Sequence, residues 1–178
     1  MEVSIVCAGF GGQGVLTAGL LLGSIANDRG QKITWFPSYG AEMRGGTANC
    51  TVKISDKNIG SPMTNHLDIA FTLNEPAIDK FESMIKPGGY LFVNSTIVDP
   101  NRKYRDDIRV IKVPASAEAE RVGNNKGVNL VMLGALISVT GLFGKEEFEE
   151  GVCRYFEGKG KGKYNAKNVE ALRAGYIV

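Results

Sequence analysis

Two short loops carry the residue types best suited to contact a ligand or another protein. The first, GFGGQGV, begins at Gly9, directly after the apolar run VSIVCA and before a long apolar stretch that starts at Val15. Glycine-rich turns between a strand and a helix let backbone N–H groups approach a partner closely, and such turns commonly cradle phosphate groups. The sequence therefore predicts a contact site formed by Gly9, Gly11, Gly12, Gln13 and Gly14.

A nucleotide site is the first alternative for this loop. Its glycines satisfy the G-x-G-x-x-G dinucleotide fingerprint, which also needs an acidic residue at the end of the second strand, about twenty residues on. That strand ends in TWFPS, and the first acidic residue beyond it is Glu42, in the next loop. A P-loop is excluded because Val15, and not Lys-Ser or Lys-Thr, follows the last glycine. A stand-alone nucleotide-dependent oxidoreductase and a small-ligand-binding module stay as alternatives, as do glycines that serve only strand-to-helix packing.

The second loop, PSYGAEMRGGTANC from Pro37, places a glutamate and an arginine among glycines. Neither helix propensity nor core packing explains such a composition. One interpretation is that Glu42 and Arg44 brace the loop's own shape. The other is that Arg44 holds a carboxylate or phosphate at an interface while Glu42 orients it. On this second hypothesis the contact residues are Tyr39, Gly40, Glu42, Arg44, Gly45 and Gly46.

The composition indicates a single domain over residues 1–178. The chain has 178 residues, of which 43% are hydrophobic, and a formal net charge of +2, so it gives no electrostatic argument for binding nucleic acid or a membrane surface. Its longest apolar run, from Leu130, is about half of a bilayer span. Cys7, Cys50 and Cys153 lie far apart and predict neither a disulfide framework nor a metal site. With no signal peptide expected either, a reducing cytoplasm is the expected compartment.

Strands alternate with helices along most of the chain. We expect strands at 3–8, 32–36, 47–55, 67–73, 90–95 and 109–113, and helices at 15–27, 75–86, 114–123, 128–141, 145–158 and 166–176. Apolar alternation at 47–55 predicts a strand with one wet face, and the turn residues Asp56-Lys57-Asn58 predict a hairpin at that point. The whole pattern is typical of a three-layer α/β/α domain with a mainly parallel sheet and a β-hairpin extension.

With both loops considered, the sequence resembles the gamma subunit of the 2-oxoacid:ferredoxin oxidoreductases, a domain III-like unit of pyruvate:ferredoxin oxidoreductase. The matching motifs are GFGGQG at 9–14, SYGAEMRGG at 38–46 with TANCTVKIS after it, PGG at 87–89, and N-x-x-x-LGAL from Asn129. They span most of the chain in the family's order. The subfamily indicated is the 2-oxoglutarate or 2-oxoisovalerate type, although Ala41 stands where a proline is expected in the 2-oxoglutarate pattern.

The resemblance implies a part in the CoA-dependent oxidative decarboxylation of a 2-oxoacid, which yields acyl-CoA, carbon dioxide and reduced ferredoxin. Thiamine diphosphate, Mg and iron–sulfur clusters are then expected on alpha, beta and possibly delta partner subunits, with coenzyme A as a co-substrate of the complex. This chain carries no GDG motif followed by an asparagine and no cysteine array. We therefore expect no catalytic residue, metal ligand or cofactor in it, and no activity from the isolated chain.

Four further features have structural explanations. Cys50 is expected to be a small buried hydrophobe, Asn129 a helix cap, and His66 a surface or turn residue without a catalytic role. The segment GKGKGK carries Lys159, Lys161 and Lys163, which we expect in a solvated linker. Contact of these lysines with a coenzyme A phosphate or an acidic partner is the alternative.

Overall fold

A mixed six-stranded sheet forms the centre of the computed structural model, which describes residues 1–39 and 46–177. The strands lie in the order β2-β3-β1-β4-β5-β6. β1, β4, β5 and β6 pair in parallel, whereas β3 runs antiparallel between β1 and β2. The strand bounds are β1 (Glu2–Phe10), β2 (Lys32–Tyr39), β3 (Thr47–Ser55), β4 (Leu67–Thr72), β5 (Ile85–Asn94) and β6 (Arg109–Val113). The predicted α/β class is confirmed.

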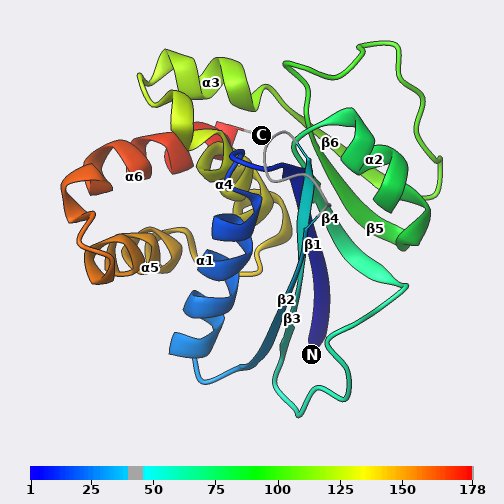
Figure 1. Ribbon diagram of the computed structural model, residues 1–178, viewed down its shortest axis with the longest axis horizontal. Coiled ribbons are helices and arrows are strands. Elements are labelled where there is room, and N and C mark those ends of the chain that lie inside the picture. Colours follow the sequence, from blue (N-terminus) through cyan, green and yellow to red (C-terminus); the bar gives the residue numbers. More distant parts are fainter. Residues whose placement is uncertain (40–45, 178) are drawn as a thin grey trace.

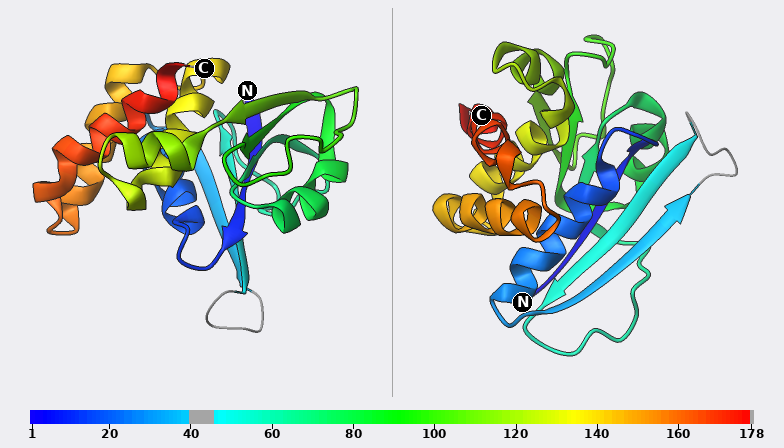
Figure 2. Two further views of the ribbon diagram at one scale, coloured as in Figure 1. Left: turned by 90° about the horizontal axis from the view of Figure 1, so that it is seen from above. Right: turned by 60° about the vertical axis from the view of Figure 1, so that its left-hand side comes forward.

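The helices cover the two faces of the sheet unequally (Figures 1 and 2). One face carries α1 (Val15–Asp28), α3 (Ala115–Arg121), α4 (Val128–Thr140), α5 (Lys145–Gly158) and α6 (Asn165–Ala174), and the other carries α2 (Glu75–Phe81). Successive side chains of β1 point to opposite faces of the sheet, so this strand contributes to both cores. Ile5 and Cys7 pack in the larger core, and Val6 and Ala8 pack against α2 in the smaller one.

The apolar run of the sequence becomes a central helix. Nine consecutive residues of α4, Asn129–Ile137, are buried. α4 contacts α1, α3, α5 and α6, and Gly134 lets it cross α6 closely, because a Cβ there would lie 1.9 Å from the Leu172 carbonyl oxygen. In the described part of the chain, no helix has both the length and the apolar character needed to span a bilayer.

The predicted hairpin occurs elsewhere in the chain. β3 pairs with β2, so the two arms of the hairpin flank residues 40–45, which lie outside the described residues. The turn at Asp56-Lys57-Asn58 does not form one, because the chain continues to β4 on the far side of β1. The apolar alternation of β3 is confirmed, with Ala48, Cys50, Val52 and Ile54 packed in the larger core. The other face of β3 was predicted to be exposed to solvent, but it is partly covered. Lys53 on that face is buried and its Nζ donates to the Met63 carbonyl oxygen at 3.0 Å.

Several elements differ from the predicted ones, as three examples show. β2 continues through Pro37 to Tyr39, because an edge strand tolerates a missing N–H donor. The helix expected at 75–86 ends at Phe81, and the chain enters β5 at Ile85, before the PGG motif. GKGKGK is not a linker: it is a tight turn between α5 and α6, closed by Gly160 at φ 68° and by hydrogen bonds from its backbone to Phe156 and Glu157.

Candidate functional site

The two predicted loops meet at the carboxyl edge of the sheet. β1 ends at Phe10, which pairs with Thr47 at the start of β3. The Gly11 N–H donates to the Gly46 carbonyl oxygen at 2.9 Å. This bond places Gly46, the described end of the second loop, beside the glycine loop. Tyr39, at the end of β2, is 67% exposed at the same edge. Gly40, Glu42, Arg44 and Gly45 fall outside the described residues.

The glycines of the first loop have different reasons to be glycine. A Cβ at Gly9 would lie 2.6 Å from Gln13 Oε1, so packing within the chain excludes a side chain there. Gly12 and Gly14 adopt φ values of 91° and 77°, which disfavour other residues. Gly11 shows neither constraint within residues 1–39 and 46–177, because its φ lies outside that region and the one described atom near a Cβ there would be the Gly46 oxygen, at 3.8 Å.

The Gln13 amide, which we predicted as part of a contact site, points into the chain instead. Its Oε1 accepts hydrogen bonds from the Phe10 N–H at 2.6 Å and from Asn74 Nδ2 at 3.2 Å. Its Nε2 donates to the Leu73 carbonyl oxygen at 3.3 Å. Asn74 is also the N-cap of α2, where its Oδ1 accepts from the Ala77 N–H at 2.9 Å. The sequence could not reveal this pairing, because the two residues are 61 positions apart.

Asn129 secures the other end of the glycine loop. It is buried in the first turn of α4, and its Nδ2 donates to the Gly14 carbonyl oxygen at 3.1 Å. The predicted role as a helix cap is wrong, since Gly127 occupies that position and makes no side-chain cap. The motif that begins at Asn129 is therefore connected to the glycine loop by a direct contact.

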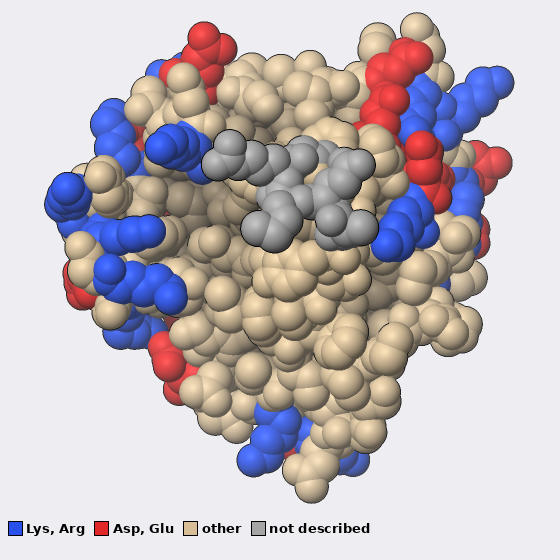
Figure 3. Space-filling view, in the orientation of Figure 1, with Lys and Arg blue, Asp and Glu red and all other residues tan. Residues whose placement is uncertain are grey.

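A groove of about 950 Å³ opens beside the glycine loop on the helical side. Gly12, Gly14 and Thr17 line it where α1 begins, and the remainder combines apolar and aromatic residues with four asparagines and three lysines. These are Asn124, Asn125, Asn129, Asn168, Lys126, Lys161 and Lys167. Glu120 is the acidic lining residue, so the groove has an excess of positive charge. Figure 3 shows basic side chains gathered on the side of the molecule that α5 and α6 form.

Two thiols lie behind the loop. Cys7 and Cys50 are buried partners in the β1–β3 register, and Cys50 Sγ is 3.6 Å from the Val15 carbonyl oxygen. A hydrogen bond with Cys50, together with burial, raises the pKa of Cys7 well above its usual value. The prediction that Cys50 is a buried hydrophobe is thus confirmed. His66 is exposed, as predicted, and its N–H donates to Thr64 Oγ1 at 3.1 Å.

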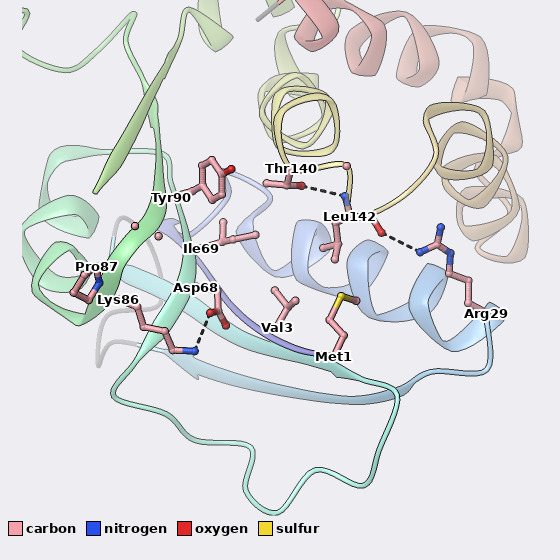
Figure 4. Close-up of a pocket in the computed structure, with 13 residues that line it drawn as sticks. Met1, Val3, Arg29, Asp68, Ile69, Lys86, Pro87, Tyr90, Thr140 and Leu142 are labelled. Carbon is pink, nitrogen blue, oxygen red and sulfur yellow. Dashed lines mark hydrogen bonds and ion pairs between the residues drawn. The ribbon is translucent and has the colours of Figure 1, made fainter. Parts of the chain in front are cut away.

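A second cavity, of about 570 Å³, lies at the opposite edge of the sheet (Figure 4). Its charged groups already have partners within the chain. Lys86 Nζ is 2.8 Å from Asp68 Oδ1, and Arg29 Nη1 donates to the Leu142 carbonyl oxygen at 2.9 Å. Burial favours the neutral form of Asp68 and so raises its pKa. The bonds from Lys86 and from the Ser4 N–H and hydroxyl outweigh burial and keep the pKa of Asp68 below its usual value. We therefore place the candidate site at the carboxyl edge.

The geometry at that edge differs from a dinucleotide site. In the fingerprint arrangement the second parallel strand lies beside the first and supplies the acidic residue for the ribose. Here the antiparallel strand β3 separates β1 from β2. Within residues 1–39 and 46–177, no cluster of three or more His, Cys, Asp or Glu side chains is arranged to hold a metal ion.

Comparison with known proteins identifies the family. The model of the pyruvate ferredoxin/flavodoxin oxidoreductase family matches residues 4–178. The chain belongs to this family. The 2-oxoglutarate synthase subunit KorC of Methanocaldococcus jannaschii is 35% identical over 180 aligned residues, covering 100% of this chain and 94% of that protein. The crystal structure of the keto/oxoacid ferredoxin oxidoreductase gamma subunit from Geobacter sulfurreducens superposes with a TM-score of 0.81, at 28% identity over 98% of this chain and 96% of that one.

Some family members carry this unit inside a longer chain. The ketoisovalerate oxidoreductase subunit VorA of Methanothermobacter thermautotrophicus is 38% identical over 98% of this chain, which spans only 36% of that protein. The 2-oxoglutarate:ferredoxin oxidoreductase from Magnetococcus marinus has the same fold, with a TM-score of 0.87 at 24% identity, and this chain covers 30% of it. The resemblance to gamma subunits of 2-oxoacid:ferredoxin oxidoreductases is thereby confirmed, and nothing in these comparisons favours the nucleotide-dependent alternative.

Proposed function

We propose that this chain is the accessory gamma subunit of a cytoplasmic 2-oxoacid:ferredoxin oxidoreductase, and that its carboxyl edge docks onto the catalytic subunits. Alpha and beta subunits, with a delta subunit in some assemblies, would carry thiamine diphosphate, Mg and the iron–sulfur clusters, and would pass electrons to ferredoxin. Relatives named for 2-oxoglutarate and for ketoisovalerate support a 2-oxoacid substrate.

Gly11 carries the docking proposal. The other glycines of the loop are explained by packing or backbone conformation within the chain, and Gly11 is not. A glycine that no described neighbour requires, placed at an exposed edge beside Gly46, is expected where another surface must approach the backbone. The Gly11 position therefore supports direct contact with a partner subunit.

Substitution of Gly11 tests this proposal. Because no described atom lies closer than 3.8 Å to a Cβ there, Gly11→Trp should leave the isolated subunit folded, with a Tm close to that of the wild-type protein. Docking should fail, since a large side chain would hold the partner surface away from the loop. We expect at least a tenfold loss of assembly with co-expressed alpha and beta subunits, with Gly11→Ala as the control that retains most assembly. Normal assembly and turnover of the Gly11→Trp complex would reject the proposal.

Arg44 and Glu42 belong to the same proposal. An arginine fork can hold a carboxylate or a phosphate, and a neighbouring glutamate can fix its orientation. Arg44→Ala should then lower turnover or assembly of the complex without unfolding the isolated subunit. Unchanged activity and assembly would reject this role.

The basic groove beside the loop suits the phosphates of coenzyme A. Lys126, Lys161 and Lys167 supply positive charge there, and the start of α1 presents backbone N–H groups. Lys126→Ala combined with Lys161→Ala should raise the KM for coenzyme A several-fold and leave the KM for the 2-oxoacid unchanged. An equal KM for coenzyme A in the variant and the wild-type complex would exclude this contact.

A further inference from the structure

The glycine loop is held by side chains from two distant parts of the chain. From one side, Gln13 Oε1 accepts from Asn74 Nδ2 at 3.2 Å, and Gln13 Nε2 donates to the Leu73 carbonyl oxygen at 3.3 Å. From the other, Asn129 Nδ2 donates to the Gly14 carbonyl oxygen at 3.1 Å. These contacts connect the loop to the junction of β4 with α2 and to the start of α4.

Such contacts oppose the natural freedom of the loop. Glycine residues populate many backbone conformations, so a loop with four of them in six positions would lose much entropy on docking unless it were already ordered. The Gln13 side chain also accepts from the Phe10 N–H at 2.6 Å, which closes the loop on itself. Asn74 and Asn129 are both buried, so they can hold the loop from inside the chain, although Asn129 also lines the groove.

We propose that Gln13, Asn74 and Asn129 are positioning residues that pre-order the glycine loop for docking. This inference rests on the proposed function of the loop, and it assigns different roles to the loop backbone and to the three side chains. The exposed backbone around Gly11 makes the contact, and the three amide side chains set its geometry. Assembly of the complex should therefore depend on the inward-facing amide of Gln13 and on the buried side chains of Asn74 and Asn129, as well as on the exposed backbone.

Asn74 allows the positioning role to be separated from helix capping. Asn74→Asp keeps an oxygen that accepts from the Ala77 N–H, and aspartate is an equally good N-cap. The substitution removes the Nδ2 donor to Gln13 and places a carboxylate oxygen against Gln13 Oε1. The Tm of the isolated subunit should change by no more than about 4 °C. Affinity for co-expressed alpha and beta subunits should fall about tenfold.

Gln13 supplies a graded series. Gln13→Glu keeps an acceptor for the Phe10 N–H and for Asn74 but cannot donate to Leu73, whereas Gln13→Met loses all of these bonds. Assembly affinity should rank glutamine first, glutamate second and methionine last. Gln31→Met is the matched control, because Gln31 makes a single side-chain bond, to Asp56, at the opposite edge of the sheet. That variant should assemble normally.

The outcomes separate this inference from the docking proposal. If Gln13→Met and Asn74→Asp assemble with wild-type affinity while Gly11→Trp does not, the positioning role is wrong and docking stands. If Gly11→Trp also assembles normally, the docking proposal itself fails. A loss of affinity that merely follows the loss of Tm, and that Gln31→Met shares, would assign these residues a structural role only and would overturn the inference.

Discussion

Replacement of Gly14 by alanine tests how tightly the loop is built. Gly14 has φ 77°, a conformation that costs other residues about 1–2 kcal/mol. The new Cβ would lie 2.5 Å from Asn129 Nδ2, so Asn129 must turn away and lose its bond to the Gly14 carbonyl oxygen, for a further ~1 kcal/mol. We expect a total loss of about 2–3 kcal/mol, which lowers the Tm by roughly 5–10 °C.

A comparison within the same loop isolates the Asn129 contribution. Gly12 has φ 91°, but a Cβ there would have no neighbour within 4 Å, so Gly12→Ala should cost only the backbone conformation, about 1–2 kcal/mol. In an Asn129→Ala background the collision disappears, and Gly14→Ala should cost the same as Gly12→Ala. The assay is urea unfolding of the four proteins of the Gly14–Asn129 cycle, with Gly12→Ala beside them.

Additivity of the two substitutions would refute this reasoning. If Gly14→Ala costs the same with and without the Asn129 side chain, Asn129 does not constrain the loop. Asn129→Ala alone should be tolerated, because the Gly14 carbonyl oxygen keeps its bond from the Ala18 N–H at 2.9 Å. The cycle should therefore give an interaction energy of about 1 kcal/mol.

Three further predictions concern the core and the surface. Gly134→Ala should destabilise by about 3 kcal/mol or more in urea unfolding, because the Leu172 carbonyl is backbone and cannot move aside; a neutral effect would contradict the close crossing. Iodoacetamide should label Cys153 of the native chain, slowly at pH 7 because burial and nearby glutamates raise its pKa, and should spare Cys7; mass spectrometry that finds modified Cys7 would disagree. The hydrogen bond from Arg29 lowers the pKa of Glu147, so this pair stabilises the fold at neutral pH and its contribution disappears as the pH falls below about 4. Glu147→Gln should remove that part of the acid sensitivity, at most about 1 kcal/mol for a half-exposed pair, and identical acid unfolding curves would argue against it.

Local sequence patterns predicted most of the helices and strands. Alternation identified the buried face of β3. The hydrogen bond between Gly11 and Gly46 shows that the glycine loop lies beside the described end of the second loop. The family resemblance gave the motif at Asn129 only as a matching motif, and its contact with Gly14 required the fold.

Long-range pairing was beyond the sequence. The residues TANCTVKIS predict a strand but not its partners. The antiparallel position of β3 between β1 and β2 depends on which strands have an unpaired edge in the fold. The direction of the Gln13 side chain could not be predicted either, because the amide of a loop glutamine can form hydrogen bonds equally well with a partner or with its own chain. Composition misled at GKGKGK, where glycine was interpreted as flexibility although Gly160 serves a tight turn with positive φ.

On the docking proposal, the chemistry of the carboxyl edge determines how this chain would contribute to turnover. The groove and the glycine loop present backbone N–H groups, amides and lysines, with Glu120 as the acidic lining residue, and such groups can hold an anion or a neighbouring backbone. The buried thiols of Cys7 and Cys50 face the core instead. On that proposal this chain would act by positioning groups on its partners, and turnover of the complex would depend on the order of its glycine loop.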